Sequence, residues 1–195
     1  MSEYMTRWGY SVNGDSLPPI IDADEFDAIT GGVMSSAPER IEAVLDGVSQ
    51  AVRDFCGWHV APVLECSWTG QGEGRLMVLP CISVRSVTSL TVNGTATEAF
   101  EWLPSGLVRL QGGCFPDAWR SAVCKFVAGE DSAGALAMAV AQIAANQLAA
   151  AAGVRSERAG QVSIDYNQTA NGVSGGVRLL DSDMRLLMPY RITAR

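Results

Sequence analysis

Residues 80–94 read PCISVRSVTSLTVNG and contain a complete strand-and-turn signal. Val87, Leu90 and Val92 stand between small polar residues, a nearly period-two pattern that predicts a half-buried strand. Asn93-Gly94 ends the stretch, and this dipeptide is typical of a two-residue hairpin turn because both central positions need positive φ. None of these side chains is reactive. We therefore predict a hairpin that serves packing or contact.

Similar short runs continue on both sides of this hairpin. Gly, Pro and Asn separate them, and their close spacing is typical of an antiparallel sheet or small sandwich. Trp68, Trp102 and Trp119 lie in or beside these runs, and we expect them to pack on the sheet. The predicted strands cover 63–69, 76–79, 84–92, 99–103, 107–110 and 121–127.

Helical patterns flank the β-rich region. The first covers 36–57: Ser36 and Glu39 have the spacing of a capping box, and Gly57 is placed to end the helix. An alanine-rich helix follows Ser132, and a short one precedes Pro189. We predict an α+β fold, a small helical bundle with an inserted antiparallel β-sheet lobe. The predicted domains are an N-terminal arm (1–35), a helical connector core with a C-terminal docking tail (36–59 and 132–195) and the β insertion (60–131).

Composition narrows the classes of function. The net charge is −7, with thirteen arginines and one lysine, which predicts no electrostatic surface for holding nucleic acid. Five cysteines without a CxxC pair favour a reduced, cytosolic interior. The start of the chain lacks the apolar core of a signal peptide. The alanine-rich segment 133–152 is too weakly apolar for membrane insertion, so we expect a soluble protein.

Catalytic candidates are few. Cys56 and His59 lie three apart, but a structural metal site needs more ligands, and His59 is the sole histidine. Ser174 is the centre of GVSGG, yet its flanks lack the strand and helix of a nucleophile elbow. We therefore expect no enzyme activity, no catalytic residue, no cofactor and no metal.

The pieces in order resemble a known family. A capped helix ends in VRDFCGWHV and leads to LPCISVRSVTSLTVNG and FEWLPSGLVRLQGG. FPDAWRSAVCKFVAGED, an alanine-rich helix, RSERAGQVSIDYN and LLDSDMRLLMPYR follow. Over residues 20–192 this order resembles the head–tail connector (adaptor, or head-completion) proteins of long-tailed bacteriophages and related gene transfer agents. The stretch 171–176 and the residues before Ile20 depart from the family pattern.

The resemblance implies a non-enzymatic virion protein of the neck, assembled in the host cytoplasm. It implies a ring, commonly of twelve copies, that joins the portal to the tail and lets DNA pass without specific binding. The partners would be the portal ring and the next neck or tail-completion protein. The portal contacts we expect are Leu186, Leu187, Tyr190, Arg191 and Arg195; the subunit contacts are Leu136, Val140, Ile143 and Gln147 on the alanine-rich helix.

Three other interpretations stay open. One is a neighbouring ring of the same neck, a head-closure or tail-completion protein. Another is a small cytosolic hydrolase that uses Ser174 or Cys56. The third is a sugar- or protein-binding β module on a helical mount. Binding to an assembled adaptor ring but never to bare portal would indicate the neighbouring ring. Labelling by serine- or thiol-directed probes would indicate the hydrolase, and quenching of exposed tryptophans by glycans would indicate the β module.

Overall fold

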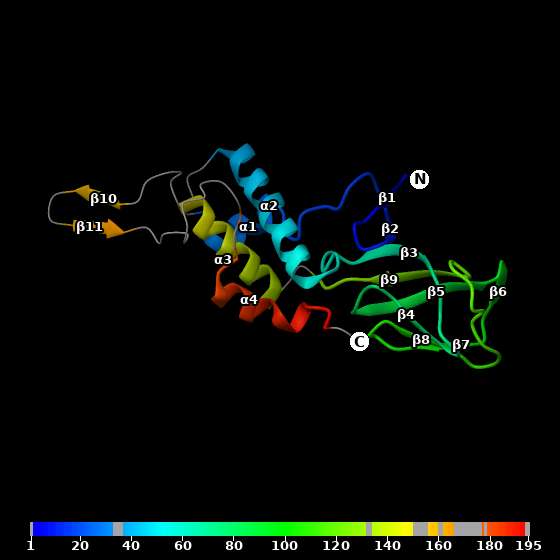
Figure 1. Cartoon of the computed structure of the whole chain (residues 1–195). Helices are drawn as coiled ribbons and strands as arrows, with labels where there is room; N and C mark the ends of the chain where they lie inside the picture. Colours follow the sequence, from blue (N-terminus) through cyan, green and yellow to red (C-terminus); the bar gives the residue numbers. More distant parts are fainter. Residues whose placement is uncertain are drawn as a thin grey trace. The chain divides into compact units, whose positions relative to one another are not determined.

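The computed structural model of the chain describes residues 2–32, 37–131, 134–149, 156–159, 162–165, 177 and 179–193. Figure 1 shows both helices and antiparallel sheets, as expected of the α+β class. The chain divides into two compact units. We call them the β unit (1–18, 56–132 and 190–195) and the helical unit (19–55 and 133–189).

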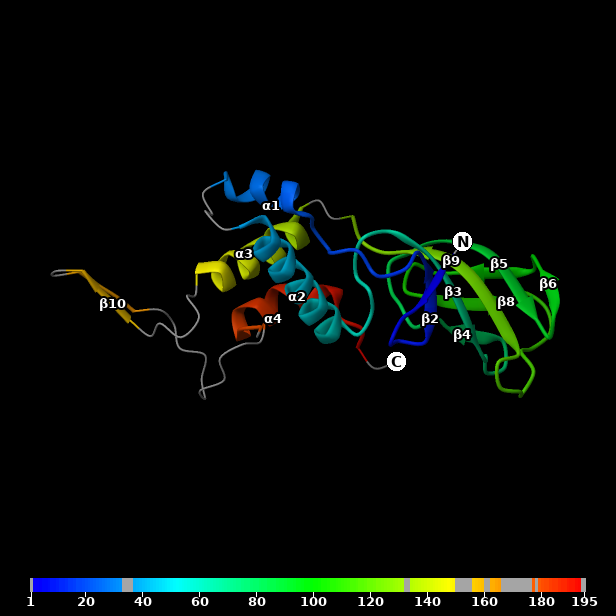
Figure 2. The same ribbon diagram turned by 90° about the horizontal axis from the view of Figure 1, so that it is seen from above.

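The β unit contains two antiparallel sheets; the smaller lies below the larger in Figure 1, and the two overlap when seen from above (Figure 2). Side chains that alternate along the strands form its core; in β9, for example, Cys124 and Phe126 are buried and Lys125 is exposed. The larger sheet has the order β1 (Glu3–Met5), β2 (Tyr10–Asn13), β3 (Leu64–Gly70), β9 (Ala122–Ala128), β5 (Val84–Val92), β6 (Thr95–Thr97). The smaller has the order β4 (Leu76–Val78), β8 (Leu107–Leu110), β7 (Phe100–Trp102).

All six predicted strands are confirmed to within one residue at each end, as β3, β4, β5, β7, β8 and β9. The hairpin at the end of β5 is confirmed too. Val92 pairs with Thr95 in β6, and the two turn residues, Asn93 and Gly94, have φ of 49° and 77°. These paired left-handed residues match the twist of the flanking strands, as a two-residue hairpin requires.

The N-terminal residues differ from the expected arm over 1–35. Residues 3–13 form β1 and β2, which extend the larger sheet beside β3. Tyr10 and Val12 of β2 are buried there, so β2 adds two side chains to the core of the β unit. The two strands are three and four residues long, too short for a periodic signal.

The acidic stretch after Ile21 forms a helix, α1 (Ala23–Thr30). Asp22 caps it: the Asp22 carboxylate accepts a hydrogen bond from the Glu25 N–H at 2.8 Å, and the Glu25 carboxylate accepts one from the Asp22 N–H at 3.1 Å. This reciprocal capping box satisfies two backbone donors that would otherwise lack partners. Asp22 and Glu25 therefore have a local structural function.

The remaining helices are α2 (Pro38–Cys56), α3 (Ala135–Ala149) and α4 (Asp181–Leu187), and η1 (Met188–Tyr190) is a 3₁₀ turn. In α2 the apolar residues Ile41, Leu45, Val48 and Val52 recur at helical spacing and are buried, and Gly57 follows the helix with φ 80°. Ser36, the predicted cap, lies outside the described residues. Helices α1 and α4 each contact α3, and the Arg40 guanidinium of α2 donates to the Leu148 carbonyl at 3.3 Å.

Two further strands, β10 (Ser156–Ala159) and β11 (Val162–Asp165), pair antiparallel as a two-stranded sheet. Both strands lie within the RSERAGQVSIDYN stretch. None of the helices in the described ranges has the length and apolar character needed to span a membrane.

Candidate docking surfaces

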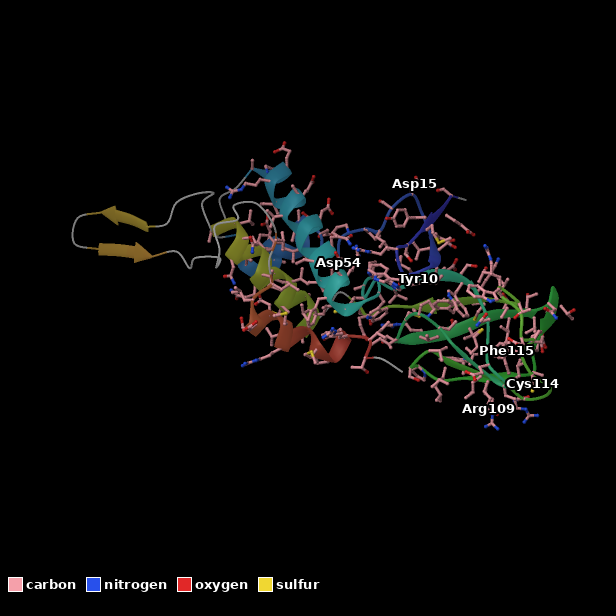
Figure 3. The ribbon with its side chains drawn as sticks, in the orientation of Figure 1. Tyr10, Asp15, Asp54, Arg109, Cys114 and Phe115 are labelled. Atoms are coloured by element: carbon pink, nitrogen blue, oxygen red, sulfur yellow. The ribbon has the colours of Figure 1, made fainter. Side chains whose placement is uncertain are left out.

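The sole histidine has a structural position. His59 and Tyr10 are both fully buried, and Tyr10 is labelled in Figure 3. The Tyr10 hydroxyl and His59 Nδ1 are 2.7 Å apart, and His59 Nε2 lies 3.0 Å from the Ala128 carbonyl oxygen. Because a carbonyl only accepts, Nε2 carries the proton and Nδ1 accepts from the hydroxyl. The His59 N–H donates back to the Tyr10 oxygen at 3.0 Å.

Cys56 cannot act with His59 as a nucleophile pair in this arrangement. Its side chain is fully buried, and burial raises the pKa of the Cys56 thiol to about 12, although Arg191 opposes the shift. A reactive cysteine needs a lowered pKa and access to substrate. Ser174, the other nucleophile considered, lies outside the described residues. Within the described part of the chain there is no group of three or more His, Cys, Asp or Glu arranged to hold a metal ion.

Of the expected portal contacts in the C-terminal segment, some are exposed and one is buried. Leu186 is 58% exposed, whereas Leu187 is fully buried. The Tyr190 carbonyl accepts a hydrogen bond from the Trp58 indole at 2.7 Å, and the Ile192 N–H donates to the Cys56 carbonyl at 2.9 Å. Residues 190–192 are therefore fastened to the β unit. Arg191 is exposed, and Arg195 lies outside the described residues.

The expected subunit contacts on α3 also differ in their burial. Leu136, Val140 and Ile143 are buried in the chain's own core, so they have no surface to offer a neighbour. Gln147 is half-buried. The exposed face consists instead of small and uncharged side chains at helical spacing, namely Ala135, Met138, Gln142, Asn146 and Ala149.

This exposed face has no charge, because α3 contains no acidic or basic residue. Met138 is 62% exposed in its middle. Solvated helix faces usually carry charges, whereas charge depletion is typical of the core of protein interfaces. Because alanine occupies every side of α3, the sequence pattern did not show that Leu136, Val140 and Ile143 face the core.

The loop between β8 and β9 presents an aromatic side chain that the sequence did not distinguish. Trp119 is 89% exposed, unlike Trp68 and Trp102, which are half-buried as expected of sheet-packing residues. Cys114 and Phe115, labelled in Figure 3, belong to the same loop. Phe115 is buried and anchors the loop. The sequence alone does not show which of the three tryptophans is buried, because burial depends on residues that are distant in the chain.

Charge is distributed unevenly along the chain. Residues 19–55 contain eight carboxylates and two arginines, whereas the remaining residues are nearly balanced. Four of these carboxylates, with Pro19, Ala23 and Leu45, line a hollow of about 450 Å³ in the helical unit. The four are Asp22, Asp24, Glu42 and Asp46.

Neither a family model nor a curated protein matches this sequence. Solved structures do match. A chain of the neck of an empty gene transfer agent (GTA) particle, computed with C6 symmetry, superposes with a TM-score of 0.61 and 18% identity over 94% of this chain and 96% of that one. This chain has the fold of a particle-neck protein.

Two more structures agree. A chain of the neck of the native GTA particle, computed with C12 symmetry, gives a TM-score of 0.54 with 15% identity, over 94% of this chain and 96% of its own. A chain of the virion of the native particle gives 0.59 with 16% identity, over 95% and 96%. Because the coverage is nearly complete in both directions, the likeness includes both units.

Proposed function

We propose that this chain is a structural, non-enzymatic protein of a phage-like virion neck, the head–tail adaptor that forms a ring between portal and tail. The observation that supports it is the fold shared with GTA neck chains over nearly the full length of both proteins. Those necks were computed with C6 and C12 symmetry, which favours a ring whose copy number is a multiple of six.

The exposed face of α3 is the proposed place of one subunit contact. It extends over four helical turns from Ala135 to Ala149 and carries no charge to desolvate. Contacts in a ring are heterologous, so a second, different surface of the neighbouring copy must cover this face. Leu136, Val140 and Ile143 would support the face from inside the core.

The C-terminal segment is the proposed portal contact. Leu186 and Met188 are 58% and 49% exposed, and Arg191 adds an exposed positive charge. Leu187 and the Tyr190 carbonyl hold this segment in place from the buried side. Arg195 would extend the contact. DNA would pass through the ring without specific binding, consistent with the acidic composition.

Native mass spectrometry tests the proposal, with the chain measured alone and after mixing with a portal ring from the same genome. We expect a complete ring of this chain on the portal. A chain that ignores bare portal but adds to an assembled adaptor ring would instead be a head-closure or tail-completion protein. A chain that binds neither would overturn the neck function.

Point variants test the portal contact better than truncation. Removing residues after Asp181 would also remove buried Leu187 and the Tyr190 carbonyl, which accepts from Trp58, so loss of fold would imitate loss of binding. Leu186→Ala with Met188→Ala removes exposed apolar groups only. We expect weaker portal binding with an unchanged unfolding midpoint, and Leu103→Ala, another exposed leucine, serves as the control.

A further inference from the structure

Trp119 is almost fully exposed, so its side chain does not stabilise the core. An indole with 89% of its surface in water contributes little to the core, whereas tryptophan is among the residues most enriched at the energetic centres of protein interfaces. Its indole N–H and the neighbouring Arg120 guanidinium are both hydrogen-bond donors. Arg120 has a φ of 57°, a left-handed conformation uncommon for arginine.

The loop that carries Trp119 is fixed at several points. Buried Phe115 packs over Gly72 so closely that a Cβ there would lie 2.3 Å from the ring. The Phe115 N–H donates to the Gly74 carbonyl at 2.7 Å, and the Ala118 N–H donates to the Pro116 carbonyl at 2.8 Å. A side chain presented by a fixed loop loses little conformational freedom on binding, so its contact contributes more to affinity.

The hollow between α1 and α2 has the complementary chemistry. Pro19, Ala23 and Leu45 provide an apolar part, and about 450 Å³ is enough space for an indole ring. Asp22, Asp24, Glu42 and Asp46 add carboxylate acceptors for an indole N–H and a guanidinium. Asp22 already caps α1, which leaves the other three carboxylates for a ligand of opposite charge.

We propose that the Trp119-Arg120 tip of one copy docks into the hollow lined by Pro19, Ala23, Asp24, Glu42 and Asp46 of the next copy. This inference rests on the proposed ring. Tip and hollow belong to different units of the chain, so the contact is head-to-tail and can repeat around a ring. The hollow has room for the Trp119 indole, and its carboxylates match the positive charge of Arg120, so we assign a second copy of this chain as the occupant.

The test measures assembly of full-length variants by native mass spectrometry and sedimentation, alone and on the portal ring. We expect Trp119→Ala to weaken association about 30-fold or more, as for a typical interface hot spot. Arg120→Asp and Asp46→Arg should each weaken it, and the double variant should recover part of the loss because the charges exchange sides. Leu103→Ala and Arg109→Asp are controls, because both residues are exposed in the β unit outside this loop.

A spectroscopic measurement keeps the test independent of folding defects. Trp119 is the most exposed tryptophan, so iodide should quench the monomer's emission and quench it less in the assembled state. A ring that forms equally well with Trp119→Ala, or whose iodide quenching equals that of the monomer, overturns the docking contact and leaves the ring intact. A wild-type chain that never self-associates, alone or on the portal, overturns both.

Discussion

Three thiols of the β unit are held in the protonated form by burial. Burial raises the pKa of Cys56, Cys66 and Cys124 to about 12 from the ordinary value near 9.0. Cys114 alone is exposed among the five cysteines, all of which lie in the described part of the chain. We expect a thiol reagent at pH 8 to label Cys114 in the native protein and all five cysteines in urea. Rapid native labelling of a second cysteine would contradict the burial.

The same raised pKa values make the fold sensitive to alkali. Between pH 9 and 12 the unfolded chain releases thiol protons that the folded chain retains, so the free energy of unfolding falls as pH rises. Below pH 9 the stabilisation is fully present. Urea denaturation at pH 8 and pH 10 measures the difference. The variant Cys124→Ala should reduce this pH dependence, and an unchanged slope would contradict the assignment.

The Tyr10 hydroxyl is expected to stabilise the β unit. Tyr10→Phe keeps the ring contacts but removes the donor to His59 Nδ1 and the acceptor of the His59 N–H. Leaving two buried polar groups without partners costs about 2 kcal/mol of unfolding free energy. Urea denaturation measures this cost. Tyr4→Phe, at a position 37% exposed, is the matched control and should cost less than 0.5 kcal/mol, roughly the usual range for surface substitutions.

At the scale of single elements, the β5–β6 hairpin depends on its turn. Gly94 has φ 77°, where a side chain costs roughly 1 kcal/mol, and nothing lies within 4 Å of an added Cβ. We expect Gly94→Ala to lower the unfolding free energy by about that amount. Gly112 has equally open space but no positive φ, so Gly112→Ala separates the conformational cost from any steric effect. If Gly94→Ala and Gly112→Ala lowered the unfolding free energy equally, the positive φ of Gly94 would not be the cause.

The strands and helices also show where sequence patterns succeed. Strands β5 and β8 have the predicted bounds, because turn residues delimit them and alternating side chains define their faces. Short β1 and β2 offered too few residues for a pattern. In α3, alanine fills the buried and the exposed sides alike, so the sequence placed the helix but assigned Leu136, Val140 and Ile143 to its surface instead of its core.

At the scale of the whole molecule, charge is concentrated in residues 19–55. A chain with this distribution should repel the phosphate backbone. We expect fluorescence anisotropy of a labelled duplex to show no binding at 50 mM salt, and no salt dependence, because a chain with a net charge of −7 should release few counterions from DNA. Binding that weakens steeply with salt would contradict the proposal that DNA passes through without specific contacts.

Sequence alone determined the α+β class, the hairpin at Asn93-Gly94 and the long helices, because these follow from periodicity and turn chemistry that act locally. Tertiary structure decided what depends on distant partners. It placed Leu187 in the core and Leu186 at the surface, joined His59 to Tyr10, and left Trp119 exposed on a fixed loop. Burial is a property of the packed chain. Two neighbouring residues of equal hydrophobicity, such as Leu186 and Leu187, differ in burial because only one of them faces the core.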